Sequence, residues 1–245
     1  IVFQKGIAEK YYTKNSVPLI VKLNGKTNLL KGDPISRQLC TVKEAVKFGA
    51  KAVGYTIYVG SKHENTMFRE FEKIQREAHK RKMPVVVWAY QRGAAVKNEF
   101  SKKILAYSAR IGLELGADII KMKYNGKIDD LRWAVKSAGR CKVVIAGGVK
   151  KNEKEFLDQV HDIRGSGAIG LAIGRNVWQA KDPLNITKKI KKAVELTKKK
   201  MPELMVDGEM QADVAVNNEI LTNLFKFSDL VRPHDGKHVY TLDSL

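Results

Sequence analysis

The chain of 245 residues has little cysteine and no long apolar run. Its two cysteines, Cys40 and Cys141, give no disulfide framework, and so sparse a use of cysteine favours a reducing compartment. No stretch approaches the roughly 18 consecutive apolar residues that a membrane-spanning helix needs. We therefore expect a soluble cytoplasmic protein that does not act at a membrane.

Several sequence motifs with known chemistry are also absent. The five histidines show no metal-ligand spacing with one another or with the cysteines, so we expect no metal site. No G-x-G-x-x-G motif follows an early strand. Residues 24–27 share the Gly-Lys-Thr letters of a nucleotide P-loop, but the upstream glycine of that motif would fall at Ile20. The sequence thus implies neither a metal nor a cofactor.

Negative charge is scarce, because 45 Lys and Arg residues face 26 Asp and Glu residues, a formal net charge of +19. Residues 201–245 reverse this balance, with three basic and eight acidic residues and a net charge of −5, which leaves +24 for residues 1–200. This shift predicts a boundary near Lys200 between a basic body and an acidic tail. A hydrophobic fraction of 44% is ample for a folded core and excludes a disordered chain.

A lysine-rich helix is predicted just before this boundary, over residues 185–199, with Ile186, Ile190 and Val194 spaced four apart. Its lysines could attract a polyanion, or they could form the solvated outer face of a packed helix. No aromatic residues interleave with them as single-strand binding requires, so we expect the solvated face and no nucleic-acid partner. The diffuse charge would still help to collect an anionic small substrate.

Short apolar runs alternate with charged helical stretches along residues 1–200. The predicted strands are Ile1–Gln4, Pro18–Asn24, Ala52–Tyr58, Val85–Tyr90, Ile119–Tyr124, Lys142–Ala146 and Ile169–Gly174. The predicted helices between them are Val42–Phe48, Asn65–Lys80, Ser101–Leu115, Ile128–Ser137 and Asn152–Ile163. At three joints a Gly-Ala pair closes a helix before an apolar strand. This rhythm is typical of parallel β/α units.

Seven strands are one short of a closed barrel, and the chain opens at Ile1, not Met, in strand-like sequence. An open doubly wound sheet is the competing architecture, but its usual dinucleotide motif is missing. We therefore predict an α/β fold of the (β/α)8 TIM-barrel type that lacks its first βα unit, in a fragment or processed chain. In such a barrel the chemistry belongs at the carboxyl ends of the strands.

Two lysines, Lys121 and Lys123, alternate with apolar residues in the predicted strand 119–124 and so share one face of it. Burial and a like neighbour both favour the neutral amine, which is the nucleophile that forms a Schiff base with a carbonyl. The structural alternative is an ion pair with Asp118 or Glu114, or a Lys123 that reaches solvent. The pattern favours a catalytic amine on this strand.

Two aromatic residues, Trp88 and Tyr90, share a face at the end of the predicted strand 85–90. A phenol at a strand end can act as a general acid or base, and an indole can form the wall of a pocket beside it. The alternative is that both residues belong to the aromatic core of the barrel.

Glycine loops follow the last two predicted strands, with Gly147 and Gly148 in the first loop and Gly174 and Arg175 in the second. Glycines let backbone N–H groups approach an anion closely, and Arg175 could add a charge-assisted contact. Two such loops after the last strands match the usual phosphate position of a TIM barrel. We therefore expect a phosphate site here.

Together these residues resemble the archaeal-type class I fructose-1,6-bisphosphate aldolases, the Schiff-base aldolases of the wider DeoC/FbaB group. The similarity runs from Ile1 to about Leu196, through segments 3–12, 22–27, 53–58, 87–90, 116–121 and 174–179. The family fold is a (β/α)8 barrel. The resemblance implies a glycolytic and gluconeogenic enzyme that acts on a small sugar phosphate, and we expect it to be a homo-oligomer.

The resemblance also implies a role for each candidate residue. Lys121 resembles the lysine that forms the imine with the ketose, and Tyr90 resembles the acid/base in carbon–carbon cleavage. Trp88 resembles the pocket wall, and a related branch that makes a seven-carbon ulosonate lacks this tryptophan. The phosphate-binding positions of the family fall on Gly147, Gly148, Gly174 and Arg175.

Two departures from the family pattern stand at the ends of the chain. The family's first strand ends in an Asp-His-Gly motif with an active-site aspartate, for which this sequence has no counterpart. The tail resembles about 25 residues of the phosphate acetyl/butyryltransferases at 206–213 and 225–230. We interpret the tail as a fused or misassembled segment that cannot by itself bind coenzyme A.

The leading hypothesis is a retro-aldol lyase that splits fructose 1,6-bisphosphate through an imine on Lys121. One alternative is a related Schiff-base aldolase for another phosphorylated sugar. A second is a non-catalytic truncated barrel that binds phosphorylated ligands, and a third is an acyltransferase fragment.

Overall fold

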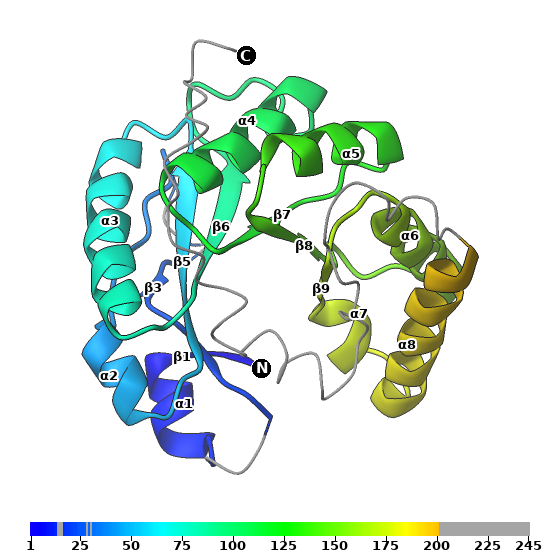
Figure 1. The fold of residues 1–245 in the computed structure, drawn as a ribbon, viewed down its shortest axis with the longest axis horizontal. Helices are drawn as coiled ribbons and strands as arrows, with labels where there is room; N and C mark the ends of the chain where they lie inside the picture. The colour runs from blue at the N-terminus through cyan, green and yellow to red at the C-terminus, as the bar shows by residue number, and fades with distance from the viewer. Residues whose placement is uncertain (14–16, 28, 30, 201–245) are drawn as a thin grey trace.

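Seven parallel strands form one sheet in the computed structural model, which describes residues 1–13, 17–27, 29 and 31–200, with the backbone alone over 195–200. The strand order is β1-β2-β5-β6-β7-β8-β9, with β1 and β9 as the end strands. The sheet curls into a half-barrel (Figure 1), and the seven predicted strands each correspond to one of its strands. The strands are β1 (Val2–Gln4), β2 (Ile20–Lys22), β5 (Ala52–Val59), β6 (Val85–Gln91), β7 (Ile119–Met122), β8 (Lys142–Ala146) and β9 (Gly170–Ala172).

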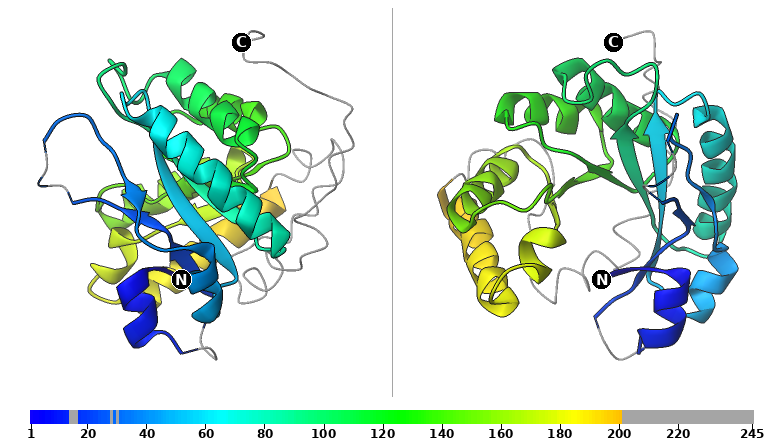
Figure 2. Two further views of the ribbon diagram at one scale, coloured as in Figure 1. Left: turned by 90° about the vertical axis from the view of Figure 1, so that its left-hand side faces the viewer. Right: turned by 180° about the vertical axis from the view of Figure 1, so that it is seen from behind.

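Helices lie along the outer side of the curved sheet (Figure 2), as right-handed crossovers between parallel strands require. They are α1 (Lys5–Tyr11), α2 (Val42–Lys47), α3 (Glu64–Lys80), α4 (Lys102–Glu114), α5 (Ile128–Ser137), α6 (Glu153–Gly165), α7 (Arg175–Trp178) and α8 (Pro183–Lys200). A small antiparallel pair, β3 (Asn24–Gly25) and β4 (Arg37–Gln38), lies in the loop after β2.

Local signals in the sequence explain where these helices begin and end. Thr41 and Glu44 form a capping box at the start of α2, Ser101 caps α4, and Asn152 caps α6. The glycines of the three Gly-Ala joints have φ angles of +83°, +76° and +88°, which side chains disfavour, so the predicted helix ends are confirmed.

The main core fills the space between the outer face of the sheet and the helices. Helix α3 buries a stripe of residues at helical spacing, Met67, Phe71, Ile74 and Ala78. A second cluster joins α8 to α6, where Ile186, Ile190 and Val194 are all buried. The predicted apolar side of the lysine-rich helix is therefore confirmed.

Some elements differ from the sequence prediction. Helix α1 was not expected, because it has seven residues and buries only Ala8, which leaves no apolar periodicity to detect. Strand β2 is three residues long, shorter than the predicted 18–24, and β7 ends at Met122, so Lys123 and Tyr124 lie in the loop beyond it. The predicted acidic tail, 201–245, lies outside the described residues.

Asp118 ties three elements together at the start of β7. Its Oδ2 atom accepts hydrogen bonds from the Val85 backbone N–H at 2.7 Å and from His79 Nε2 at 2.9 Å. The carboxylate thereby joins the end of α3 to the starts of β6 and β7, and its side chain is 11% exposed. Loss of an acceptor at a site this dry leaves its donors unsatisfied.

We expect Asp118→Ala to lower the free energy of unfolding by about 1–3 kcal/mol, because two donors lose their acceptor. Urea unfolding would measure the change. Asp129→Ala is the matched control, since the Asp129 side chain is 80% exposed and pairs only with Arg132 on its own helix. The control should change stability by less than about 0.5 kcal/mol. Equal midpoints for the two variants would contradict the assigned role.

Candidate active site

Side-chain alternation divides β6 and β7 between two environments. Val87 and Ala89 of β6, like Ile120 of β7, point outward into the core beneath the helices. Trp88 and Ile119 belong to a separate small cluster on the inner face of the curved sheet. The inner face therefore carries the polar and aromatic candidates, whereas the outer face holds the fold together.

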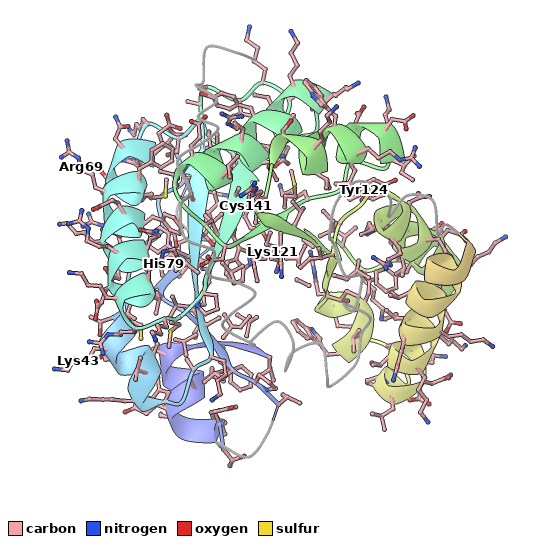
Figure 3. All side chains as sticks on the ribbon, in the orientation of Figure 1. Lys43, Arg69, His79, Lys121, Tyr124 and Cys141 are labelled. Atoms are coloured by element: carbon pink, nitrogen blue, oxygen red, sulfur yellow. The ribbon has the colours of Figure 1, made fainter. Side chains whose placement is uncertain are left out.

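Lys121 projects from the middle of the sheet toward this inner side (Figure 3). Its Nζ atom lies 5.1 Å from the centroid of the Trp88 ring, and Trp88 is its register partner on β6. Among the described residues no carboxylate pairs with this ammonium group. Burial lowers the pKa of Lys121 from 10.5 to about 8, because the charged form loses hydration that no counter-ion replaces.

Lys123, the further candidate on the same face of the predicted strand, has a different environment from Lys121. It forms an ion pair with Glu99, and its Nζ atom lies 5.7 Å from the Tyr90 ring centroid. The proposed pairing with Asp118 or Glu114 is wrong, because Asp118 accepts from His79 and Val85, and Glu114 accepts from Arg110. Lys123 has a counter-ion and Lys121 does not, so the geometry favours Lys121 as the nucleophile.

Trp88 belongs to β6, and its side chain lies over the neighbouring strand β5. The residue is 6% exposed. A Cβ atom built at Gly54 of β5 would overlap the six-membered ring of Trp88, so the indole covers the backbone at Gly54. Gly54 thus leaves the space that the ring occupies. The position of Trp88 against Lys121 depends on this glycine.

Tyr90 ends the inner row of β6 and pairs in register with Tyr58 of β5. Burial raises the pKa of Tyr90 to about 12; Tyr58 acts in the same direction, and the positive charge of Arg175 acts against it. Tyr90 is therefore a neutral phenol at physiological pH, which is a proton donor at rest. Arg175 lies close enough to act on the Tyr90 phenol. Tyr90 and the last glycine loop are therefore at the same end of the half-barrel.

The two glycine loops are held together by one buried side chain, Asn176. Its Nδ2 atom donates to the carbonyl oxygens of Gly147 and Val149, each at 2.9 Å. Its Oδ1 atom accepts from the Lys151 N–H at 2.8 Å. Arg175 Nη2 donates to the Gly148 carbonyl at 2.9 Å, so the loops after β8 and β9 form one unit.

Backbone conformation at this unit favours glycine. Gly148 is exposed and has a φ angle of +73°, where side chains are strained, and nothing lies within 4 Å of a Cβ atom built there. The four predicted phosphate residues, Gly147, Gly148, Gly174 and Arg175, are thus brought together at the carboxyl ends of neighbouring strands.

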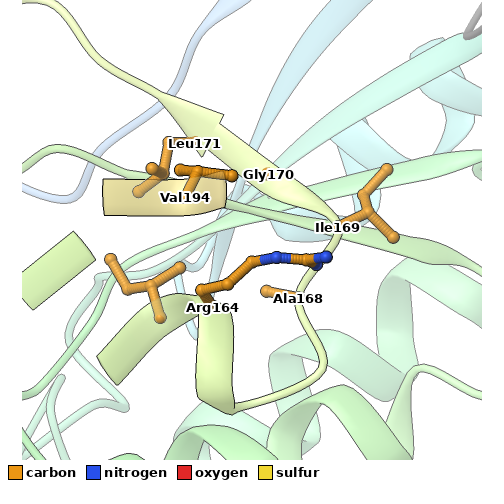
Figure 4. Close-up of a pocket in the computed structure, with 7 residues that line it drawn as sticks. Arg164, Ala168, Ile169, Gly170, Leu171 and Val194 are labelled. Carbon is orange, nitrogen blue, oxygen red and sulfur yellow. The ribbon is translucent and has the colours of Figure 1, made fainter. Parts of the chain in front are cut away.

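Two cavities lie elsewhere in the described part of the chain. A small one between α6, β9 and α8 is lined by Arg164, Ile169 and Val194 (Figure 4) and contains none of the candidate residues. An open hollow after β5 and β6 is lined by Lys62 and Arg92, among others. The second cavity has two cationic side chains and one carboxylate, Asp33, in its lining, and it lies at the same end of the sheet as Tyr90.

In the described ranges no group of three or more His, Cys, Asp or Glu side chains is placed to hold a metal ion. None of the helices described has the length and hydropathy of a membrane-spanning segment.

Sequence reasoning missed three residues that shape the site, Lys22, Gly54 and Asn176. Lys22 carried the same signal as Lys121, a lysine in an otherwise apolar predicted strand. Gly54 had a weaker signal, a glycine inside a buried strand, which indicates a close approach. Asn176 had none, because its role depends on a loop that is 25 or more residues away in sequence.

Comparison with known proteins gives two family matches. The model of DeoC/LacD family aldolases matches residues 1–180, and the model of phosphate acetyl/butaryl transferases matches residues 180–233. The second match begins earlier than the predicted boundary at Lys200, within the part that packs against α6. Most of it lies outside the described residues.

Individual relatives agree with the first match. The class 1 fructose-bisphosphate aldolase of Thermoproteus tenax is 53% identical over 195 residues, which are 79% of this chain and 74% of that protein. The corresponding protein of Halobacterium salinarum is 48% identical over 182 residues, 74% of this chain and 69% of that one.

A solved structure is similar throughout the half-barrel. It is an archaeal fructose-1,6-bisphosphate aldolase whose catalytic Lys is covalently bound to the carbinolamine intermediate of the substrate. The TM-score is 0.77 at 52% identity, over 79% of this chain and 77% of that one.

We expect Gly54→Ala to displace the Trp88 ring, because the added methyl group would occupy the position of its six-membered ring. Near-ultraviolet circular dichroism and tryptophan fluorescence would report the movement. Gly170→Ala is the matched control, since a Cβ atom in this other strand glycine would meet only Val144, at an ordinary 4.0 Å. Unchanged spectra for Gly54→Ala would contradict the packing described.

Proposed function

Because this chain belongs to the DeoC/LacD family of aldolases, we propose that it is a class I fructose-1,6-bisphosphate aldolase. The reaction is the reversible cleavage of fructose 1,6-bisphosphate to dihydroxyacetone phosphate and glyceraldehyde 3-phosphate. The observation that carries the proposal is Lys121, which lies against Trp88 on the inner face of the sheet and has no counter-ion in the described part of the chain.

Imine formation begins with the neutral amine of Lys121. With a pKa of about 8, roughly one molecule in ten has this amine neutral at pH 7, against about one in three thousand at the ordinary value of 10.5. The amine attacks the C2 carbonyl of the open-chain ketose, and loss of water gives the protonated imine. The face of Trp88 is electron-rich and so favours the positive charge that returns to this nitrogen.

Cleavage of the C3–C4 bond sends its electron pair toward the imine while the C4 hydroxyl loses its proton. Tyr90 is the group we assign to this proton, directly or through a water molecule. In condensation the neutral phenol gives its proton to the aldehyde oxygen, which suits a resting tyrosine with a raised pKa. In cleavage the reverse transfer needs Tyr90 as its phenolate, so the phenol first gives its own proton to a water molecule and then takes the proton of the C4 hydroxyl. The cleavage leaves an enamine on Lys121, which takes a proton from water at C3 to become the imine again. Hydrolysis of this imine releases dihydroxyacetone phosphate and restores Lys121.

The two phosphate groups of a bisphosphate substrate need two anion-binding sites. One phosphate would bind the unit of Gly147, Gly148, Gly174 and Arg175, in which the backbone at Gly148 is exposed and has open space beside it. For the second phosphate we propose the open hollow after β5 and β6, through the side chains of Lys62 and Arg92. Its Asp33 carboxylate is already engaged with the backbone N–H groups of Lys62 and Ala94. A substrate with one phosphate at each of these two sites would have its carbon chain near Lys121 and Tyr90.

The remaining expectations belong to the same proposal. We propose a cytoplasmic homo-oligomer, a catalytic body over residues 1–200 and a separate acidic segment over residues 201–245. The buried amine of Lys121, whose lowered pKa makes the neutral form accessible, favours an enzyme over a non-catalytic ligand-binding barrel. The tryptophan at position 88 favours the sugar-bisphosphate branch of the family over the branch that makes a seven-carbon ulosonate.

Borohydride reduction in the presence of dihydroxyacetone phosphate should leave one covalent adduct on Lys121, located by mass spectrometry. Only the neutral amine attacks, so below pH 8 the trapping rate should rise about tenfold per pH unit, and above pH 8 it should level off. Lys121→Met should abolish both the adduct and cleavage. An adduct on Lys123, or none at any pH, would contradict the proposal.

Tyr90→Phe should lower the cleavage rate by about 10²–10⁴-fold, the usual contribution of a general acid or base. The same variant should still form the reduced adduct with dihydroxyacetone phosphate, because imine formation does not require the C4 proton. Tyr58→Phe is the comparison, since this tyrosine is the register partner of Tyr90 on the adjacent strand. If Tyr58→Phe has the larger effect on cleavage, the proton transfer is assigned to the wrong phenol.

A further inference from the structure

A second amine lies over the same Trp88 ring as Lys121, and the mechanism above does not use it. We propose that Lys22 is a positioning residue that keeps Lys121 in its uncharged, nucleophilic form. This inference rests on the proposed function, in which Lys121 must attack a carbonyl.

Geometry places both amines at the same tryptophan. The Lys22 Nζ atom lies 5.6 Å from the centroid of the Trp88 ring, and the Lys121 Nζ atom lies 5.1 Å from it. Lys22 is on β2 and Lys121 is on β7, so β5 and β6 separate the two strands.

Gly54 is what allows the ring to reach from one lysine to the other. It is the register partner of Lys22 on β5, and the Trp88 ring covers its backbone. On its other side Trp88 pairs in register with Lys121. Trp88 is in register with Thr56 on β5, so its ring reaches diagonally, two residues along β5, to lie over Gly54. In this way the ring links Lys22 of β2 to Lys121 of β7 across four adjacent strands.

The two ammonium groups oppose each other's charge. Burial lowers the pKa of Lys22 to about 8, and the charge of Lys121 contributes in the same direction. Coulomb repulsion is mutual, so a proton on Lys22 likewise disfavours a proton on Lys121.

The hydrogen bonds decide which lysine keeps its proton. Lys22 Nζ donates to the backbone carbonyl of Asn24 at 2.8 Å, a contact that favours the ammonium form. The Asn24 side chain is itself fixed by the backbones of Ser36 and Thr56. Lys121 has no carbonyl or carboxylate acceptor among the described residues, so the charge belongs on Lys22.

Other titratable groups at this end of the sheet do not replace Lys22. Lys123 is paired with Glu99. Tyr90 is a neutral phenol, and Arg175 points its guanidinium group to the Gly148 carbonyl. Lys22 is therefore the cation that shares the Trp88 ring with the nucleophile.

The test measures the protonation of Lys121 without using the aldolase reaction. Reductive methylation with formaldehyde and cyanoborohydride modifies neutral amines, and mass spectrometry gives the extent at each lysine as a function of pH. In the wild-type chain the midpoint for Lys121 should lie below the midpoint for Lys22. Lys22→Met and Lys22→Gln should raise the Lys121 midpoint by about one pH unit, which is about a tenfold loss of neutral amine at pH 7.

Two control variants separate charge from packing. Lys22→Arg keeps the positive charge and should leave the Lys121 midpoint near its wild-type value. Lys102→Met removes another lysine that lies over a tryptophan, 5.1 Å from the Trp133 ring on the outer helices, and should change nothing at Lys121. Thermal unfolding would check that each variant is folded.

The inference is overturned if the Lys121 midpoint stays unchanged in both neutral variants, or if Lys22 loses its proton before Lys121 in the wild-type chain. A shift of equal size in Lys22→Arg would also overturn it, because packing rather than charge would then be the cause. The proposed function fails separately, if dihydroxyacetone phosphate and borohydride leave no adduct on Lys121.

Discussion

An ammonium group held on the inner face of the sheet without a counter-ion is the constraint on which the site depends. Lys121 projects from β7 toward Trp88, and burial brings its pKa to about 8. A carboxylate at this point would hold the lysine in its charged form and remove its nucleophilicity. The chain avoids this outcome by directing nearby carboxylates elsewhere, as Asp118 to His79 and Glu99 to Lys123 show.

The fold tolerates this arrangement because the two faces of the sheet have different tasks. The outer face and the helices bury the continuous apolar core, so the stability of the half-barrel comes from residues such as Ile120 and Val87. The inner face is then free to carry groups that are unfavourable for stability but useful for chemistry. Gly54 illustrates the division, since it contributes no side chain to the core and leaves room for the Trp88 ring.

The anion-binding end of the half-barrel depends on contacts between loops. Asn176 joins the loop after β8 to the loop after β9, and Arg175 adds a second link at Gly148. The charge of Arg175 also reaches Tyr90. A phosphate group that bound this unit would therefore change the electrostatic environment of the phenol we assign to proton transfer.

Much of the architecture could be predicted from the sequence, because it depends on local and periodic signals. Apolar runs, helical spacing and the Gly-Ala joints predicted the seven strands and the main helices. Side-chain alternation placed Trp88 and Tyr90 on one face of their strand, and it placed Lys121 on the face opposite Ile120 and Met122. Short elements escaped, since α1 buries one residue and β3 and β4 have two residues each. Periodicity needs more residues than these elements contain.

The pairing of charges was decided only by the tertiary structure. Lys121 and Lys123 are equivalent by sequence alternation, but Glu99, which is 24 residues away, pairs with one and not the other. Lys22 reaches the site from a strand about 100 residues earlier than Lys121 only because β5 and β6 bring the two strands to the same tryptophan. The sequence by itself determined which strands carry amines and aromatic rings. Their protonation depends on hydration and on neighbours in space, and those are properties of the folded chain.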